Sequence, residues 1–209
     1  MLLVREDILR RMSEVALLDR LVITPLLDKS QIGPASVDLR LGSGFIEARR
    51  RDAHVIDPSD AKPISNLITE DRYEVPLGES LYIHPGQFLL GATFEFIRLP
   101  TNLGGQVLGR SSWGRLGLMV ATAVTVQPGF GGCLTLELQN LGSVPIRLFP
   151  GLRVAQIMLW QSSSPTENPY SSSADFQAQL GPESPRTGWE MGEVDKLVSI
   201  GKRLQGNNN

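Results

Sequence analysis

Residues 109–137 read GRSSWGRLGLMVATAVTVQPGFGGCLTLE, and this stretch combines turn signals, strand signals and several polar side chains. The stretch holds an Arg-Ser-Ser turn, a second arginine at Arg115, a Pro-Gly break and a carboxylate at Glu137. Residues 134–138 alternate leucine with Thr135 and Glu137. This period of two predicts a β-strand with its leucines on one face and its two polar side chains on the other.

Short strands and turns continue outward from this stretch, from residue 73 to residue 160. The apolar segments are separated by glycine-containing turns, with Pro-Gly pairs at 85–86, 128–129 and 150–151. Proline followed by glycine favours a tight turn. Many short strands with regular turns are typical of an antiparallel barrel or a jelly-roll-like sandwich. The fold class predicted is therefore mainly β, a distorted antiparallel barrel.

The flanking segments predict other structure. Apolar residues at helical spacing indicate one short amphipathic helix within residues 5–18, and alternation over 35–41 indicates a half-buried strand. Residues 47–65 are polar, with arginines at 49–51, and predict a surface excursion. We expect a single helical turn within residues 111–118, with Trp113 and Leu116 packed against the core.

The chain is predicted to form one domain over residues 1–161 and a tail over residues 162–209. The tail is rich in Ser, Gln, Gly and Pro and has little periodic hydrophobicity. Such a composition predicts an extended segment that becomes ordered only against a ligand or a neighbouring subunit. We expect residues 206–209 to be disordered.

Composition excludes several classes of partner. The formal net charge is -2 and the pI is about 5.7, so no general basic field attracts nucleic acid or an anionic membrane. There is no apolar run of membrane-spanning length and no signal-peptide core. The single cysteine, Cys133, rules out an internal disulfide. We expect a soluble, cytoplasmic protein without a nucleic-acid or membrane partner.

Four residues of the opening stretch suit a phosphate: Arg110, Ser111, Ser112 and Arg115. A guanidinium offers planar bidentate donors, and hydroxyls and turn amides add neutral ones. The alternative is an ordinary turn in which Ser111 or Ser112 is the N-cap. Glu137 also has a plain alternative as a solvated or salt-bridged carboxylate. Its closeness to the arginines and serines in sequence favours a functional role.

A zinc site is not expected, because His54 and His84 lie far apart and neither has a cysteine or second histidine beside it. We interpret Trp113 and Trp160 as core or interface anchors. Nothing adjacent to Cys133 in the sequence would activate a thiolate.

Taken together, several ordered motifs resemble the dCTP deaminase family of the dUTPase-like superfamily. They are QIGPASVDLRLG from Gln31, HPG from His84, GRSSWGRLG from Gly109, PGF from Pro128, LTLE from Leu134, PG from Pro150, and NPYS from Asn168 on to Gln179. This resemblance covers most of the first 180 residues. It implies a distorted β-barrel, a homotrimer with active sites at subunit junctions, and a C-terminal tail that folds over bound nucleotide.

The resemblance also implies roles for individual residues. Glu137 is the general base and acid, Ser111 and Arg115 position the attacking water, and the remaining residues contact the nucleotide. Those substrate-binding positions are Arg110, Ser111, Ser112, Thr122, Ala123, Gln127, Thr135, Tyr170 and Gln179.

The chemistry implied is hydrolytic deamination by a carboxylate. Glu137 would take a proton from water as it adds to C4 of cytosine, then deliver protons to N3 and to the departing ammonia. Arg115 would keep Glu137 ionised. Zinc deaminases need a Pro-Cys-x-x-Cys element, and this chain has one cysteine. We therefore expect no cofactor for the chemistry, with Mg²⁺ only accompanying the nucleotide phosphates.

The chain departs from the family pattern at three places. Gln127 stands where family members usually have an aspartate, and an amide can hydrogen-bond a hydroxyl but cannot act as a base. Asp175 stands where a lysine is usual, and a carboxylate there would repel a terminal phosphate. The segment between Leu118 and Thr122 is one residue short and lacks a histidine.

Three functions remain open from the sequence. The first is deamination of a cytidine nucleotide, with dCTP to dUTP as the family default. The second is a nucleotide pyrophosphatase or a bifunctional enzyme that converts dCTP to dUMP, against which Gln127 argues. The third is a non-catalytic nucleotide-binding regulatory module.

Overall fold

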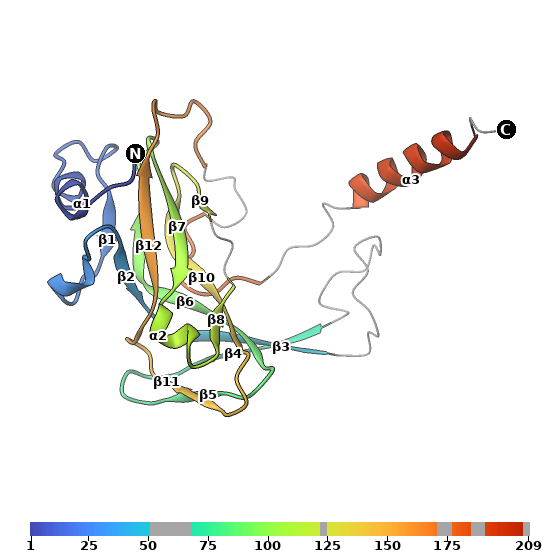
Figure 1. Ribbon diagram of the computed structural model, residues 1–209, viewed down its shortest axis with the longest axis horizontal. Coiled ribbons are helices and arrows are strands. Elements are labelled where there is room, and N and C mark those ends of the chain that lie inside the picture. Colours follow the sequence, from blue (N-terminus) through green and yellow to red (C-terminus); the bar gives the residue numbers. More distant parts are fainter. Residues whose placement is uncertain (51–67, 122–124, 171–176, 185–190, 207–209) are drawn as a thin grey trace. The chain divides into compact units, whose positions relative to one another are not determined.

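The computed structural model describes residues 1–50, 68–121, 125–170, 177–184 and 191–206 (Figure 1). The chain divides into two compact units, Met1–Glu47 with Arg72–Glu183, and Ala48–Asp71 with Ser184–Asn209. Every predicted site residue that the structure describes lies in the first unit.

The helices are α1 (Arg5–Met12), the 3₁₀ helix η1 (Lys29–Gln31), α2 (Ser111–Gly114) and α3 (Met191–Gly206). The strands are β1 (Val22–Thr24), β2 (Val37–Arg40), β3 (Gly44–Arg50), β4 (Ile68–Glu74), β5 (Leu81–Ile83), β6 (Phe88–Arg98), β7 (Leu103–Gly109), β8 (Leu118–Val120), β9 (Thr125–Val126), β10 (Gly131–Asn140), β11 (Ile146–Leu148) and β12 (Arg153–Gln161).

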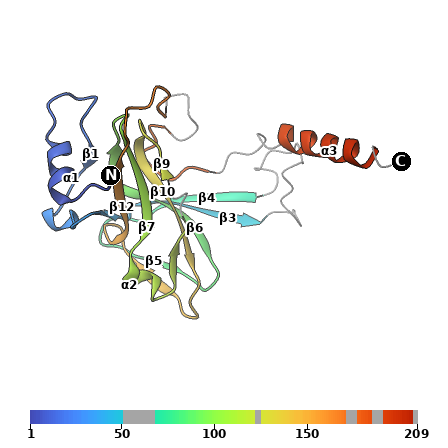
Figure 2. The same cartoon turned by 45° about the horizontal axis from the view of Figure 1, so that its top comes forward.

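The strands form antiparallel sheets, which confirms the mainly β prediction. One sheet has the order β4-β3-β6-β10-β8, with β1 also paired to β6. A second has the order β2-β12-β7-β9, and β5 pairs with β11 in a third. Both views of the first unit place the β5–β11 pair at the end away from β9 (Figures 1 and 2).

Alternating burial along the strands builds the core between the sheets. In β2, Val37 and Leu39 are fully buried while the residues between and after them are partly exposed. In β10, Leu136 and Leu138 are fully buried. Burying one such side chain contributes about 1.5–3 kcal/mol. The predicted strand over residues 35–41 is therefore present as β2, with the predicted alternation.

The three Pro-Gly pairs form the predicted turns. In each, the amide after the glycine donates to the carbonyl before the proline: Gln87 to His84 at 3.0 Å, Phe130 to Gln127 at 3.1 Å and Leu152 to Phe149 at 3.2 Å. The glycines have φ angles of 77°, 89° and 90°. Proline at the second position and a positive φ at the third suit a type II turn, so glycine is needed there.

The N-terminal helix is shorter than predicted. It ends at Met12, and residues 13–19 form turns with Val15 90% exposed. The guanidinium of Arg20 donates to the carbonyl groups of Glu14 and Val15. The carbonyl groups of Glu14 and Val15 are therefore bonded to a side chain rather than to the amides of a continuing helix. The chain then turns back toward β1.

Two other segments differ from expectation. β3 continues as a strand to Arg50, so the first part of the predicted surface excursion belongs to a sheet; residues 51–67 lie outside the described residues. α3 was not predicted, although Val194, Leu197, Val198 and Gly201 follow helical spacing. Among the described residues, no helix is both long and apolar enough to cross a membrane.

Candidate active site

Strand β10 carries Glu137 on the face predicted from the sequence. Leu134, Leu136 and Leu138 are buried, while Thr135 and Glu137 are partly exposed on the other face. Glu137 pairs with Leu90 of β6, and its carbonyl oxygen accepts the Ala121 amide at 2.8 Å. Burial raises the pKa of the Glu137 carboxyl. A carboxyl group in this environment is suited to accept and return a proton.

The tail segment 177–183 lies along this strand. The Ala178 amide donates to the Gly131 carbonyl at 2.6 Å, and the Cys133 amide donates to the Gln179 carbonyl at 2.8 Å. The Gln179 side chain is 8% exposed, and its Nε2 donates to the Cys133 carbonyl at 2.6 Å. The tail is thus bonded to the beginning of β10, and the nearer of the two bonded residues, Cys133, is four positions before Glu137.

Two predicted binding residues, Thr135 and Gln179, are brought together by this arrangement. Gln179 Nε2 lies 3.4 Å from the Thr135 hydroxyl oxygen, which also accepts the Glu183 amide at 3.2 Å. The sequence analysis missed Gln177, whose Oε1 accepts the Gly131 amide at 2.8 Å. The second glutamine, two residues before Gln179, was the available signal in the sequence, although the two are joined by a turn in which Ala178 has a φ of 60°.

Gln127 and Tyr170 meet at the Pro128-Gly129 turn. Gln127 is exposed at the first position of that turn, and the Tyr170 amide donates to the Pro128 carbonyl at 2.8 Å. The Tyr170 ring lies 5.9 Å from the Phe130 ring, centroid to centroid. The structure therefore joins these two predicted residues through the backbone of one turn. Thr122, Ala123 and Asp175 lie outside the described residues.

The Arg-Ser-Ser segment forms the beginning of α2. Arg110 is the N-cap, so the alternative in which Ser111 or Ser112 caps the helix does not hold; both serines are within the helix and exposed. The Trp113 Nε1–H donates to the Arg153 carbonyl at 2.9 Å, which anchors the helix on β12. Leu116 is 63% exposed rather than packed, because the turn after Gly114 directs it outward. The predicted helical turn is therefore confirmed only over Ser111–Gly114.

Arg110 points toward β2. Its Nε is 3.4 Å from Asp38 Oδ1, and its amide donates to the Val154 carbonyl at 3.1 Å. The sequence places Asp38 in a predicted strand and gives no indication of its contact with Arg110. Its position on the partly exposed face of β2 was the signal for a further role.

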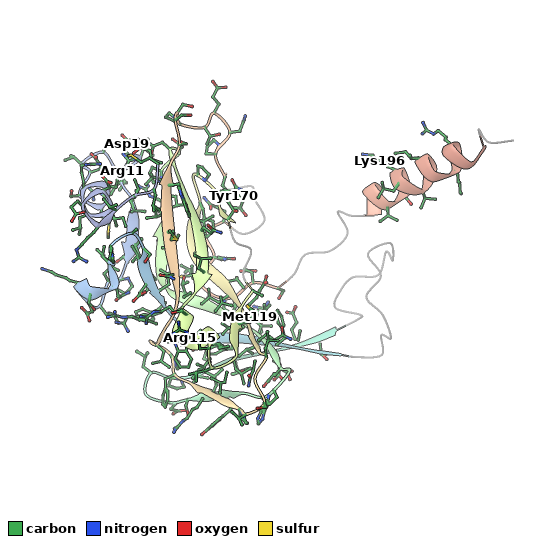
Figure 3. The ribbon with its side chains drawn as sticks, in the orientation of Figure 1. Arg11, Asp19, Arg115, Met119, Tyr170 and Lys196 are labelled. Atoms are coloured by element: carbon green, nitrogen blue, oxygen red, sulfur yellow. The ribbon has the colours of Figure 1, made fainter. Side chains whose placement is uncertain are left out.

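Glu137 and the residues of α2 lie on separate elements of the first unit. Among the described residues, no hydrogen bond or ion pair joins Glu137 to Ser111 or Arg115. Figure 3 shows Arg115 beside α2 and Tyr170 in a different part of the first unit. Burial raises the pKa of the Glu137 carboxyl, which is the direction opposite to the one expected from a neighbouring Arg115. The described candidate residues thus fall into two groups, one on β10 and the tail and one at α2.

A cavity of about 610 Å³ lies beside the tail, but none of the predicted site residues lines it. Its walls come from Gly42–Ile46, Arg72–Glu74, Ala92–Phe94, Cys133 and Leu180–Glu183. Within the described ranges, no three His, Cys, Asp or Glu side chains are grouped so that they could hold a metal ion.

Comparisons with known proteins agree on one family. The dCTP deaminase-like family model matches residues 2–162. The dCTP deaminase of Halorubrum lacusprofundi is 44% identical over 192 residues, covering 90% of this chain and 92% of the relative. The dUMP-forming dCTP deaminase of Dictyoglomus thermophilum is 43% identical over 171 residues, covering 80% of this chain and 87% of the relative.

A solved structure shares the fold. The crystal structure of 2'-deoxycytidine 5'-triphosphate deaminase from Agrobacterium tumefaciens matches with a TM-score of 0.54 and 24% sequence identity. The match covers 76% of this chain and 46% of the solved one. With its antiparallel sheets, its family match and relatives above 40% identity, this chain belongs to the dCTP deaminase-like family of enzymes.

Proposed function

We propose that this protein deaminates a cytidine nucleotide, converting dCTP to dUTP and ammonia, with Glu137 as the general base and acid. The observation that carries the proposal is the setting of Glu137, a partly buried carboxyl on the polar face of β10 whose pKa is raised by burial. General acid–base catalysis is most efficient when the pKa of the group lies near the working pH.

The reaction balances around this carboxylate. Glu137 takes one proton from water as the water oxygen bonds to C4, and returns that proton to N3. The remaining hydroxyl proton then passes through the carboxylate to the exocyclic nitrogen, which leaves as ammonia while the C4 carbonyl forms. One water is consumed, one ammonia is released and the carboxylate is regenerated.

We propose that the two halves of the site come from different copies of the chain in a homotrimer. Arg110, Ser111, Ser112 and Arg115 would hold the phosphates and the attacking water from one copy. Glu137 would act from the next copy, together with the tail. The exposure of both serines and of Arg115 on α2 supports this arrangement, because these donors face solvent in the single chain.

A second candidate is a bifunctional enzyme that forms dUMP, which the name of the Dictyoglomus thermophilum relative favours. Relatives of both names are about equally similar to this chain, so identity does not separate them. We favour dUTP as the product because Gln127 is an amide, which cannot deprotonate a water for attack on a phosphate.

The chemistry proposed needs no metal, and Mg²⁺ enters only with the substrate phosphates. The composition supports this, because a zinc deaminase needs two or more cysteines in its signature and Cys133 is the only one here.

Product analysis tests the proposal directly. The pure protein is incubated with cytidine and uridine nucleotides, and the products are separated by chromatography. We expect dCTP to lose its cytosine absorbance and release ammonia while keeping three phosphates. Pyrophosphate and dUMP would instead establish the bifunctional enzyme, and unchanged nucleotide with measurable binding would establish a regulatory module.

The variant Glu137→Gln tests the role of the carboxyl. Removing general acid–base catalysis lowers a rate by about 10²–10⁴-fold, whereas a neutral amide of the same shape leaves binding largely intact. We expect ammonia release to be lost and the Kd for dCTP to change little. Glu79→Gln, an exposed carboxylate before β5, is the control and is expected to behave as the wild type. Full activity in Glu137→Gln would remove this residue from the mechanism.

A further inference from the structure

The guanidinium of Arg110 contacts the rest of the described protein through two of its three nitrogens. Its Nε lies 3.4 Å from Asp38 Oδ1, and its NH1 lies 3.5 Å from the Arg153 carbonyl oxygen. The NH2 group has no hydrogen bond or ion pair among the described residues, and the side chain is 35% exposed. A guanidinium carries five N–H donors in a rigid plane. The NH2 group therefore remains available for an oxyanion.

Asp38 is itself fixed by a second arginine. Its side chain is 15% exposed, and Oδ2 lies 3.4 Å from Arg153 NH1. Arg153 NH2 in turn contacts Asp28 Oδ2 at 2.9 Å and Ser30 Oγ at 2.8 Å. The charges alternate along this row, and Arg110 stands at its end.

A buried polar network sets the position of β2 on both sides of Asp38. Gln31 Nε2 donates to the Asp38 carbonyl at 3.1 Å and to Glu95 Oε1 at 2.9 Å. The Arg40 amide donates to Glu95 Oε2 at 2.9 Å. Gln31 and Glu95 are both fully buried. Because a satisfied buried network holds its members rigidly, the Asp38 backbone is fixed from the core.

We infer that Asp38 is a positioning residue, which holds the Arg110 guanidinium so that its NH2 group meets the substrate phosphates. The inference rests on the proposed function, which assigns Arg110 to the phosphates. Arginine is well suited to such a role, because its planar fork loses less entropy when it is already oriented. Bidentate contact with a phosphate also depends on the direction of the fork.

The direction in which phosphate affinity changes on replacement of Asp38 distinguishes a positioning role from a purely electrostatic one. Asp38 is an anion near the site proposed for an anionic substrate, so removal of its charge alone would strengthen phosphate binding. Loss of positioning would weaken phosphate binding. A purely structural role would lower the stability of the fold without a specific effect on phosphorylated ligands.

The test compares Asp38→Asn with Asp7→Asn. Asp7 also pairs with an arginine, Arg10, and its side chain is 18% exposed, but it lies on α1. Reordering one arginine side chain costs about 1–2 kcal/mol, which corresponds to roughly tenfold in affinity. We expect the KM for dCTP to rise about tenfold in Asp38→Asn with a smaller change in kcat. The affinity for unphosphorylated deoxycytidine should not change, and Asp7→Asn should match the wild type.

Arg110→Gln supplies the coupling measurement. If Asp38 acts through Arg110, adding Asp38→Asn to Arg110→Gln should raise the KM no further. Calorimetric binding of dCTP and of inorganic tripolyphosphate gives the same comparison without turnover. If Asp38→Asn does not fold, Asp38→Glu keeps the charge but displaces the carboxylate, and its KM should rise in the same direction.

The outcomes distinguish the positioning role of Asp38 from the proposed deamination of dCTP. A wild-type protein that deaminates dCTP, with an unchanged or lower KM in Asp38→Asn, overturns the positioning role alone. A wild-type protein that binds dCTP or tripolyphosphate without turnover overturns the proposed reaction, and the Kd values then decide on Asp38. Binding of neither ligand overturns both.

Discussion

Glu137 carries a cost to folding that depends on pH. Burial raises the pKa of this carboxyl in the folded chain, while in the unfolded chain the pKa is about 4.3. Below the unfolded value the carboxyl is protonated in both states, and its contribution to stability is fully present. As the pH rises through the folded value, the contribution is lost, because the folded state then holds an unfavourable buried charge.

Replacement of Glu137 by Gln should therefore stabilise the protein at neutral pH. We expect this in an Arg115→Ala background, which removes the guanidinium that a neighbouring copy would bring to the carboxylate. The Tm of Arg115→Ala/Glu137→Gln should exceed that of Arg115→Ala at neutral pH, and the two should converge near about pH 4. Equal melting temperatures at both pH values would contradict a buried charge at this position.

The sequence predicted the strand face on which Glu137 lies, but not the contacts of the site residues. The alternation of Leu with Thr135 and Glu137 was enough to place the carboxyl on the polar face, since the period of a strand fixes its side-chain directions. The partner of Arg110 was not predictable, because Asp38 lies 72 positions earlier and reaches it only through the pairing of β2 with β12 and β12 with β7. The raised pKa of Glu137 was not predictable either, because it depends on the tertiary packing around β10.

The turn between α2 and β8 depends on Gly117. Its φ is +94°, and a Cβ built there would lie 2.6 Å from the Gly142 nitrogen. The Leu141 amide donates to the Gly117 carbonyl at 2.8 Å, which joins this turn to the end of β10. The turn thus fixes where α2 stands relative to the strand that carries Glu137.

Gly117→Ala should lower the free energy of unfolding by about 2–4 kcal/mol, because a left-handed φ and a backbone clash both oppose the methyl group. Gly114→Ala is the matched control, since a Cβ there meets nothing within 4 Å. We expect that control to change stability by less than about 1 kcal/mol. Denaturant unfolding measures both, and equal stabilities would show that the turn can relax.

Elements set by local sequence were predicted, and those set by tertiary contacts were not. The Pro-Gly turns followed from two residues each, because proline fixes one φ and glycine allows the next. The end of α1 depends on the Arg20 side chain bonding back to Glu14 and Val15, which no local pattern reveals. α3 was missed because the composition of the tail outweighed a short run of helical spacing at Val194, Leu197 and Val198.

At the scale of the assembly, the division of the site into two halves predicts complementation between inactive variants. In a cyclic trimer each junction would take Glu137 from one copy and Arg115 from its neighbour. Glu137→Gln and Arg115→Ala should each be inactive alone. When the two are coexpressed in equal amounts, random assortment restores a complete pair at about a quarter of the junctions. The measurement is ammonia release per junction from the purified mixture.

The control mixes separately assembled trimers without exchange of subunits, and it should remain inactive. Lack of activity in the coexpressed protein, with mixed trimers confirmed by mass, would place both residues in one chain.

The pairing of the tail with β10 has a consequence for solubility. Gly131 and Cys133 direct their amide or carbonyl groups to residues 177–179, on the side of the strand that β6 does not occupy. An uncovered strand edge offers hydrogen bonds to any extended peptide and is a common origin of aggregation. Residues 177–179 therefore cover this edge of β10 as well as lying near the candidate site. A chain shortened before residue 177 would be open there to edge-to-edge association with its own copies.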